Sequence, residues 1–270
     1  MAYTVWLPRG DLLPRTLTGL VAIPAVVFII FQGQFFLKII GVLAAFGLLR
    51  EWSNLSFSKP YHWLSFVCFS SILFGFFPAL RVGALLMTLA GCGWFLYLKV
   101  FKSEELKVIC FGYLYITSAM AIIIHIMPNF GVNFALLVLT LVWSVDTGAF
   151  LAGKTFGGPK LAPAISPNKT WSGFVGGIIF GLGSVILLTR VMNIEVSESF
   201  WAFAGVSVFL AQGGDLLESW CKRFFKVKDS GNFLPGHGGM LDRLDSLLAV
   251  SFAIAVLWYF CGNANAHVLS

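Results

Sequence analysis

The apolar positions of this chain form long runs, with few of the polar interruptions that give soluble helices and strands a two-sided pattern. An apolar run of about 17–25 residues can cross the hydrocarbon core of a bilayer as a helix. Backbone polar groups in lipid must bond within the protein, so these runs predict helices rather than open sheets. The runs predict about nine spans, at residues 17–31, 35–49, 64–80, 82–98, 108–126, 132–151, 171–191, 199–218 and 246–261. The first two are short, and the pattern leaves open whether they cross fully or form a helical hairpin.

The composition agrees with this pattern. Of the 270 residues, 58% are hydrophobic and 11% are charged, and the mean hydropathy is +0.87. Soluble domains carry about 25% charged residues, so the predicted fold class is an all-α polytopic membrane protein. The five cysteines are scattered and form no C-x-x-C pair, which favours packing residues over a disulfide framework or a zinc site.

The placement of the cations predicts the orientation in the membrane. The formal net charge is +6. With about nine spans and a cytoplasmic N-terminus, the opposite side receives only Lys38, Arg81 and Arg190, which is the asymmetry of the positive-inside rule. The C-terminus then lies on the opposite side, and the loops at 152–170 and 219–245 face the cytoplasm. The compact chain favours a bacterial cytoplasmic (inner) membrane.

The ionisable residues divide the chain unevenly. Residues 1–107 hold spans joined by short basic loops, and we interpret them as scaffold or lipid-facing helices. Residues 108–270 hold most of the clustered ionisable groups and form the predicted catalytic part. Within it, Gly173, Gly177 and Gly181 recur every four residues, a spacing that lets another helix approach closely. Packing inside the chain is favoured over a dimer contact, and a homodimer stays open.

Asp146 and Asp215 are carboxylates that lie inside predicted spans. Asp146 is near the end of the sixth run, and Asp215 is in the eighth. An ionised carboxylate at membrane depth is costly unless it is paired or bound to a cation, so both are candidate functional residues. A polar helical face surrounds the second of them, and it consists of Gln212, Asp215, Glu218, Ser219 and Lys222. A structural ion pair of Asp215 with Lys222 or Arg223 is the alternative.

Asp242 and Asp245 are three residues apart and share a helix face at the start of the last run. Together with a carboxylate from another helix, they suit a hard divalent cation such as Mg²⁺, which prefers one or two carboxylates plus substrate phosphate oxygens. The alternative is a capped, solvated helix start that binds no ligand.

The segment between the last two runs concentrates cations and glycines beside these carboxylates. Glycines at 236, 238 and 239 allow a phosphate to approach the backbone. The neighbouring cations are Lys222, Arg223, Lys226 and Lys228. Phosphate binding is favoured over contact with anionic lipid, because the carboxylates would weaken that attraction. His237 is a candidate phosphate ligand or proton donor, with a structural role as the alternative.

The loop before the seventh run contains Ser166, Asn168, Lys169 and Thr170. Lys169 lies near a predicted helix start, where free N–H groups favour anions. A capping role for Ser166 or Thr170 is the alternative to substrate contact. Upstream, the letters GAFLAGKT at 148–155 fit the P-loop pattern. A membrane span precedes them and apolar residues fill the loop positions, which argues against a P-loop.

Three motifs together resemble the phosphatidate cytidylyltransferases, also called CDP-diacylglycerol synthases. The longest reads SWCKRFFKVKDSGNFLPGHGGMLDRLD and covers residues 219–245. The two upstream motifs are D-x-x-A-F-x-x-G-K-x-F-G at 146–157 and SPNKT at 166–170, in the same order. Cys221 stands where the family usually has an aliphatic residue, and Asn168 replaces a residue that is often basic in relatives.

The resemblance implies that CTP and phosphatidate give CDP-diacylglycerol and pyrophosphate with Mg²⁺, the first committed step of phospholipid synthesis. A second cation stays open, membrane lipid is the expected surrounding, and no nucleic acid is expected. The implied metal ligands are Asp215, Asp242 and Asp245. The further implied catalytic residues are Lys222, Arg223 and His237. The implied substrate-binding residues are Asp146, Lys154, Ser166, Asn168, Lys169, Thr170, Lys228, Asp229, Gly238, Gly239 and Arg243.

Two other functions fit parts of the pattern. A CTP-dependent polyprenol or phytol kinase would transfer the γ-phosphoryl group to an alcohol and release CDP. An ion-coupled transporter would place its carboxylates near the membrane midplane and show an inverted repeat. Here the carboxylates gather at one membrane face, and no repeat is visible in the sequence.

Overall fold

The computed structural model describes residues 24–55, 62–74, 93, 104–227, 229–231 and 239–261. The span predicted at 82–98 lies outside these residues apart from Gly93. The spans predicted at 17–31 and 64–80 are described in part.

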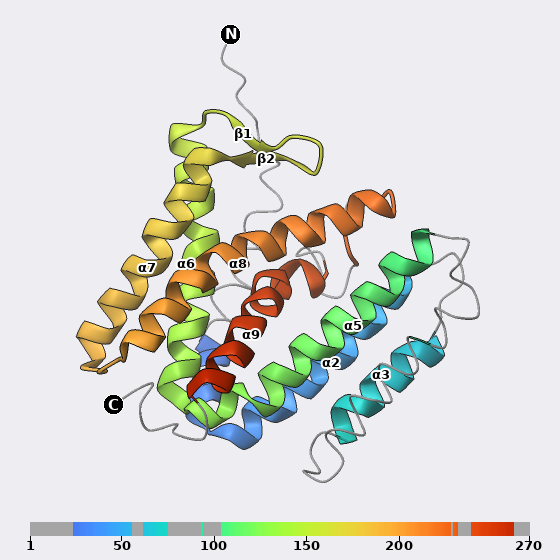
Figure 1. Cartoon of the computed structure of the whole chain (residues 1–270), viewed down its shortest axis with the longest axis horizontal. Helices are drawn as coiled ribbons and strands as arrows, with labels where there is room; N and C mark the ends of the chain where they lie inside the picture. The colour runs from blue at the N-terminus through green and yellow to red at the C-terminus, as the bar shows by residue number, and fades with distance from the viewer. Residues whose placement is uncertain are drawn as a thin grey trace.

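Within the described residues, five segments are long and apolar enough to cross a membrane (Figure 1). They are α5 (Glu104–His125) continued by the 3₁₀ turn η3 (Met127–Phe130), α6 (Val132–Phe156), α7 (Trp171–Met192), α8 (Glu198–Phe224) and α9 (Leu241–Cys261). The helices that precede them are α2 (Gln34–Leu55) and α3 (His62–Phe74). These apolar helices agree with the predicted helical membrane protein. The count of nine spans and the positions of the termini stay predictions.

The helices pack as neighbouring pairs. α6 and α7 lie side by side, α8 packs with α9, and α2 lies beside α5 (Figure 1). Because α9 contacts both α8 and α5, it joins the two halves of the bundle. The interior is filled by large side chains such as Tyr113, Phe134 and Phe200. Apolar side chains on the outside, such as Ile179 and Leu187 of α7, suit contact with lipid tails.

The segment between α6 and α7 is not the simple loop expected at 152–170. α6 extends into it, and the chain then turns at Gly157 and Gly158, whose φ values of 61° and 98° suit residues without a side chain. Strands β1 (Lys160–Ala162) and β2 (Ser166–Thr170) follow as an antiparallel pair. The all-α prediction is wrong for this segment, because the pairing of two short strands leaves no signal in a hydropathy pattern dominated by membrane spans.

α8 and α9 are longer than the apolar runs that predicted them. α8 ends at Phe224 rather than near residue 218, and α9 begins at Leu241 rather than at residue 246. Hydropathy ends a predicted span where charged residues become frequent. An ion pair between the two helices, from Lys222 to Asp242, stabilises these charges and lets the helical backbone continue.

Glycines on α7 let α6 approach closely. A Cβ built at Gly173 would lie 2.7 Å from the backbone oxygen of Ala149, and one at Gly177 would lie 3.1 Å from the backbone oxygen of Val145. A Cβ at Gly181 would lie 2.5 Å from the side chain of Val145. The predicted glycine stripe therefore packs inside the chain, which is the arrangement that the sequence favoured over a dimer contact.

Gly176→Ala is expected to destabilise the protein, because the new Cβ would lie 2.9 Å from the backbone oxygen of Gly148 and backbone cannot move aside cheaply. Overpacking of this kind costs about 1–3 kcal/mol, which a lower midpoint of thermal unfolding in detergent would report. Gly183→Ala on the same helix is the control, since its Cβ has no described neighbour within 4 Å. Equal midpoints for the two variants would contradict the close packing of α6 and α7.

Candidate active site

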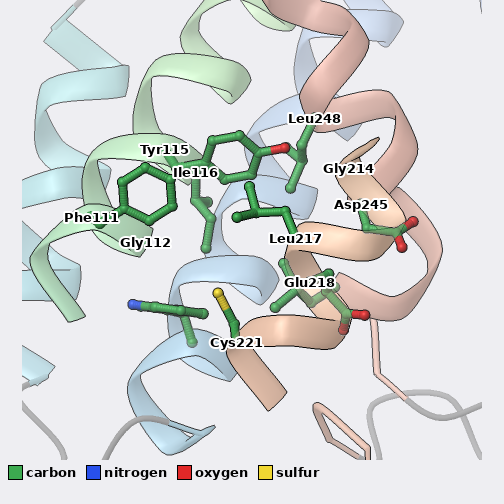
Figure 2. Close-up of a pocket in the computed structure, with 12 residues that line it drawn as sticks. Phe111, Gly112, Tyr115, Ile116, Gly214, Leu217, Glu218, Cys221, Asp245 and Leu248 are labelled. Atoms are coloured by element: carbon green, nitrogen blue, oxygen red, sulfur yellow. The ribbon is translucent and has the colours of Figure 1, made fainter. Parts of the chain in front are cut away.

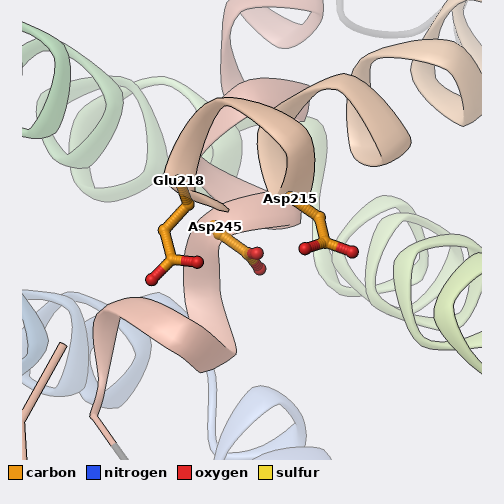
Figure 3. A group of neighbouring side chains, drawn as sticks. All are labelled: Asp215, Glu218 and Asp245. Carbon is orange, nitrogen blue, oxygen red and sulfur yellow. The ribbon is translucent and has the colours of Figure 1, made fainter. Parts of the chain in front are cut away.

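Three carboxylates from two helices meet where α8 packs on α9 (Figure 3). Asp215, Glu218 and Asp245 each offer an oxygen within 4.8 Å of the other two, and we call them the acidic cluster. The helices approach closely here because residue 214 is glycine: a Cβ on Gly214 would lie 2.6 Å from the backbone oxygen of Asp245. Asp215 and Asp245 are thus brought together, as the sequence predicted.

The three carboxylates of the acidic cluster differ in their exposure to solvent. Glu218 and Asp245 are 6% and 8% exposed, whereas the side chain of Asp215 is 39% exposed. The Oε1 atom of Glu218 is buried and has no hydrogen-bond partner among the described residues. Burying a polar atom without a partner costs free energy, so this oxygen is suited to receive a cation or a polar ligand.

Asp146 of α6 lies beside the acidic cluster. Its Oδ1 accepts a hydrogen bond from the hydroxyl of Ser246 at 3.2 Å, and Ser246 directly follows Asp245. The carboxylates of Asp146 and Asp215 repel each other, and Lys169 attracts both. Carboxylates from α6, α8 and α9 therefore converge, which is the arrangement predicted from their positions near the ends of apolar runs.

Lys222 connects the acidic cluster to Asp242. Its Nζ lies 2.7 Å from Glu218 Oε2 and 2.7 Å from Asp242 Oδ1. Asp242 also accepts a hydrogen bond from the backbone N–H of Gly239 at 3.0 Å. Lys222 therefore bridges Asp242 and Glu218, and the two carboxyl groups lie close enough to interact directly as well. The sequence offered an ion pair of Asp215 with Lys222 or Arg223 as the alternative to a functional role. In the structure Lys222 pairs with Glu218 instead.

The β-hairpin supplies a cation on the open side of the acidic cluster. Lys169 Nζ of β2 lies 2.7 Å from Asp215 Oδ2. The next residue, Thr170, is buried and caps α7, because its Oγ1 accepts a hydrogen bond from the backbone N–H of Gly173 at 3.1 Å. The capping role that the sequence left open is thus observed for Thr170.

The other predicted site residues lie toward the exposed edge. Arg223 donates to the backbone oxygens of Ile165 and Val227, at 3.4 and 3.3 Å, and so ties the end of α8 to the β-hairpin. The Nζ of Lys154 lies 5.6 Å from the centre of the Phe150 ring. The remaining exposed or half-buried ones are Ser166, Asn168, Asp229 and Arg243. Those outside the described residues are Lys228, His237 and Gly238.

A small cavity lies behind the acidic cluster, between α5, α8 and α9 (Figure 2). Its volume is about 20 Å³, which is enough for one water molecule. Tyr115 of α5 lines this cavity together with Glu218 and Asp245, and its hydroxyl is buried without a partner among the described residues. The exposed lining is almost entirely apolar, so the cavity is a small packing gap next to the carboxylates.

Glu218 is the member of the acidic cluster that the sequence analysis did not assign to the site. Its spacing carried a signal, since it lies three residues after Asp215 and four before Lys222 and shares a helix face with both. The same spacing also fits a plain ion pair with the lysine. The structure shows this ion pair and also the burial of Glu218 and its closeness to Asp245, which are not visible in the sequence.

Carboxylates and lysines held together at the ends of apolar helices define the class of this protein: a helical membrane protein with a charged site built into its spans. Residues 13–261 match the Cytidylyltransferase family, and the chain belongs to that family. It is an enzyme, a nucleotidyltransferase of phospholipid synthesis.

Curated relatives agree with this assignment. The phosphatidate cytidylyltransferase of Brucella suis biovar 1 (strain 1330) is 32% identical over 263 residues, which cover 93% of this chain and 93% of that protein. The enzyme of the same name from Brucella abortus (strain 2308) gives the same identity and coverage. The phosphatidate cytidylyltransferase of Staphylococcus aureus (strain COL) is 46% identical over 123 residues, covering 44% of this chain and 46% of that protein.

Proposed function

We propose that this enzyme transfers the cytidylyl group of CTP to phosphatidate, which gives CDP-diacylglycerol and pyrophosphate at the cytoplasmic face of the membrane. The observation that carries the proposal is the convergence of the acidic cluster with Lys169 and Lys222, each of which lies 2.7 Å from one of its carboxylates. The printed names of the relatives, phosphatidate cytidylyltransferase, support the same pair of substrates.

The acidic cluster fits a divalent cation such as Mg²⁺. This ion prefers carboxylate oxygens together with substrate phosphates, and Glu218 Oε1 is a buried oxygen that lacks a partner among the described residues. Asp215, Glu218 and Asp245 are the residues that would hold it. When bound, the cation supplies positive charge that offsets the negative charge of the reacting phosphates.

For Asp242, which the sequence predicted as a metal ligand, the observed contacts favour a positioning role. Its Oδ1 accepts from Lys222 Nζ at 2.7 Å, and its Oδ2 accepts from the N–H of Gly239 at 3.0 Å. Both oxygens of Asp242 thus have donors, whereas Glu218 Oε1 has none among the described residues. We therefore propose that Asp242 orients Lys222 toward the acidic cluster.

The proposed reaction needs no strong general base. A phosphate monoester is already largely ionised at neutral pH, so an oxygen of phosphatidate can attack the α-phosphorus of CTP without first giving a proton to a side chain. The new bond to the α-phosphorus forms as its bond to the bridging oxygen of the β-phosphate breaks, and pyrophosphate leaves. The two anions need relief from repulsion, and the leaving group needs stabilisation.

Lysine and arginine side chains provide this relief. Lys169 and Lys222 are each held 2.7 Å from a carboxylate, so their ammonium groups are already oriented when a phosphate arrives. Arg223 and Arg243 extend the positive charge along the ends of α8 and α9. The segment that contains Gly239 would shape the triphosphate pocket. The further contacts that we propose for the substrates involve Asp146, Lys154, Ser166, Asn168, Thr170, Lys228, Asp229, His237 and Gly238.

Radiolabelled CTP tests this function. CTP labelled at the α-phosphate should label chloroform-extractable lipid when purified protein, phosphatidate and Mg²⁺ are all present, and label at the γ-phosphate should appear in pyrophosphate. Entry of the γ-label into lipid with release of CDP would instead identify a lipid kinase. Absence of labelled lipid from a folded preparation would contradict the proposal.

A further inference from the structure

A buried carboxylate in the N-terminal part of the chain reaches the edge of the proposed site. Glu51 of α2 is 7% exposed. Its Oε1 accepts a hydrogen bond from the hydroxyl of Ser230 at 2.8 Å, and its Oε2 accepts one from the backbone N–H of Leu241 at 2.9 Å. These donors lie 179 and 190 residues further along the chain, so the contact exists only because of the tertiary fold.

The neighbouring residue, Trp52, holds Glu51 in place. The indole Nε1 of Trp52 donates to the backbone oxygen of Ile109 at 3.1 Å. Its ring packs against Gly112 and lies edge-on to the ring of Phe225, with 5.8 Å between the ring centres. α2 is therefore fixed to α5 and to the end of α8 next to Glu51. The carboxylate is presented from a rigid position.

Glu51 and Asp242 together clasp the two ends of the segment 231–239. Before the segment, Ser230 donates its hydroxyl to Glu51 and its backbone N–H to Asp242 Oδ2, at 3.4 Å. At its far end, the N–H of Gly239 donates to the same Asp242 oxygen at 3.0 Å. We call Glu51, Ser230 and Asp242 the clasp.

The segment ends fit closely around Glu51. Gly231 and Gly239 both pack directly against its carboxylate, and a Cβ at either position would collide with Oε1. Met240 packs against Gly47, which lies on α2 about one turn before Glu51. The fit requires a residue without a side chain at both ends, which adds a structural reason for glycine to that of phosphate approach.

We infer that Glu51 is a positioning residue for CTP binding, an inference that rests on the proposed function. It holds Ser230 and Leu241 by hydrogen bonds and packs against Gly231 and Gly239, next to Asp242. Direct contacts run from Glu51 through Ser230 and Asp242 to Lys222, whose Nζ is 2.7 Å from Asp242 Oδ1. A change at Glu51 therefore alters the binding of CTP by displacing Ser230, Asp242 and, through them, the ammonium group of Lys222.

Glu51→Met tests the inference, because it keeps the length of the side chain but removes both acceptors. The concentration of CTP that gives half-maximal rate should rise at least about tenfold, with a smaller change in kcat, since a lost hydrogen bond to a charged group is worth roughly that factor. Glu51→Gln keeps an acceptor for Leu241 and should stay within about threefold of the wild type. Arg50→Met, an exposed change one residue away, is the matched control and should behave as the wild type.

The role of Glu51 in folding is separated by measuring thermal unfolding of each variant and referring the kinetics to the folded fraction. If Glu51→Met fails to fold, Ser230→Ala is the substitute, because it removes only one hydroxyl of the clasp. It should also raise the concentration of CTP that gives half-maximal rate. If the folded fraction of the variant needs the same CTP concentration for half-maximal rate as the wild type, the inference is overturned, because Glu51 would then act on stability alone.

Hydrogen exchange without substrates distinguishes this inference from the proposed function. The backbone amides of Ser230, Gly239 and Leu241 should exchange about tenfold faster in Glu51→Met than in Arg50→Met, because local opening of the clasp becomes easier. If the wild type forms no CDP-diacylglycerol, the proposed function is wrong. Faster amide exchange in Glu51→Met would still support the clasp in that case. Normal turnover with unchanged exchange would overturn the clasp alone.

Discussion

Asp215→Asn is expected to lower the CTP- and Mg²⁺-dependent conversion of phosphatidate by on the order of 1,000-fold. Asp215 is the open member of the acidic cluster, and its Oδ2 lies 2.7 Å from Lys169 Nζ. Asparagine keeps the size of the side chain and one oxygen but removes the negative charge that would hold a cation and that orients the lysine. The chemical step should therefore fail while the fold persists.

Two measurements check this prediction. Turnover is followed against Mg²⁺ concentration in detergent, and binding of Mn²⁺ as a substitute ion is followed by electron paramagnetic resonance. Mg²⁺-dependent turnover and Mn²⁺ binding should both be weaker in Asp215→Asn. Glu195→Gln removes an exposed carboxylate between α7 and α8 and should leave both unchanged. Near-normal turnover with an unaltered Mg²⁺ dependence would remove Asp215 from the metal site.

Lys222→Met is expected to lose both stability and activity. The side chain of Lys222 is 14% exposed and serves two carboxylates, Glu218 and Asp242, whose side chains are 5% and 17% exposed. Removing one partner of a buried ion pair leaves the other charge uncompensated, which costs about 3–5 kcal/mol. The free energy of unfolding in detergent should fall by this amount, and turnover should fall with the loss of a phosphate-binding cation.

Two further variants make this prediction specific. Lys107→Met removes an exposed lysine that pairs with Glu104, where both side chains are more than half exposed, and should cost about 0–1 kcal/mol. Lys222→Met combined with Glu218→Gln should regain part of the lost stability, because one uncompensated charge is gone, but should regain no activity. If Lys222→Met proves as stable as Lys107→Met, the buried ion pairs do not stabilise the fold.

Much of the fold could be predicted because membrane spans leave a strong local signal. The runs at 108–126, 132–151 and 171–191 correspond closely to α5, α6 and α7. The ends of α8 and α9 could not be placed by the same reasoning, since the charges that end an apolar run are stabilised there by partners on another helix. The β-hairpin depends on cross-strand pairing, which hydropathy does not report.

The candidate site was predictable to the extent that membrane depth makes charge expensive. That argument identified Asp146 and Asp215, the shared helix face added Asp242 and Asp245, and the structure brings Asp146, Asp215 and Asp245 near one another. The sequence reasoning named Asp242 and not Glu218 as the third carboxylate, whereas Glu218 is the one grouped with Asp215 and Asp245 in the structure. Asp242 and Glu218 both lie one turn from an assigned aspartate on a charged helix face, and only the tertiary structure shows that Glu218 is the more buried and keeps an oxygen without a partner among the described residues.

The sequence by itself determined that the chain is built from apolar helices and that its charged chemistry is gathered at their ends, because both properties follow from the cost of leaving polar groups in hydrocarbon. The tertiary structure alone decided which charges meet. Glu51 contacts Ser230 and Leu241 across 179 and 190 residues of chain. No local pattern encodes such a contact, because it depends on how α2, α5 and α9 pack against one another.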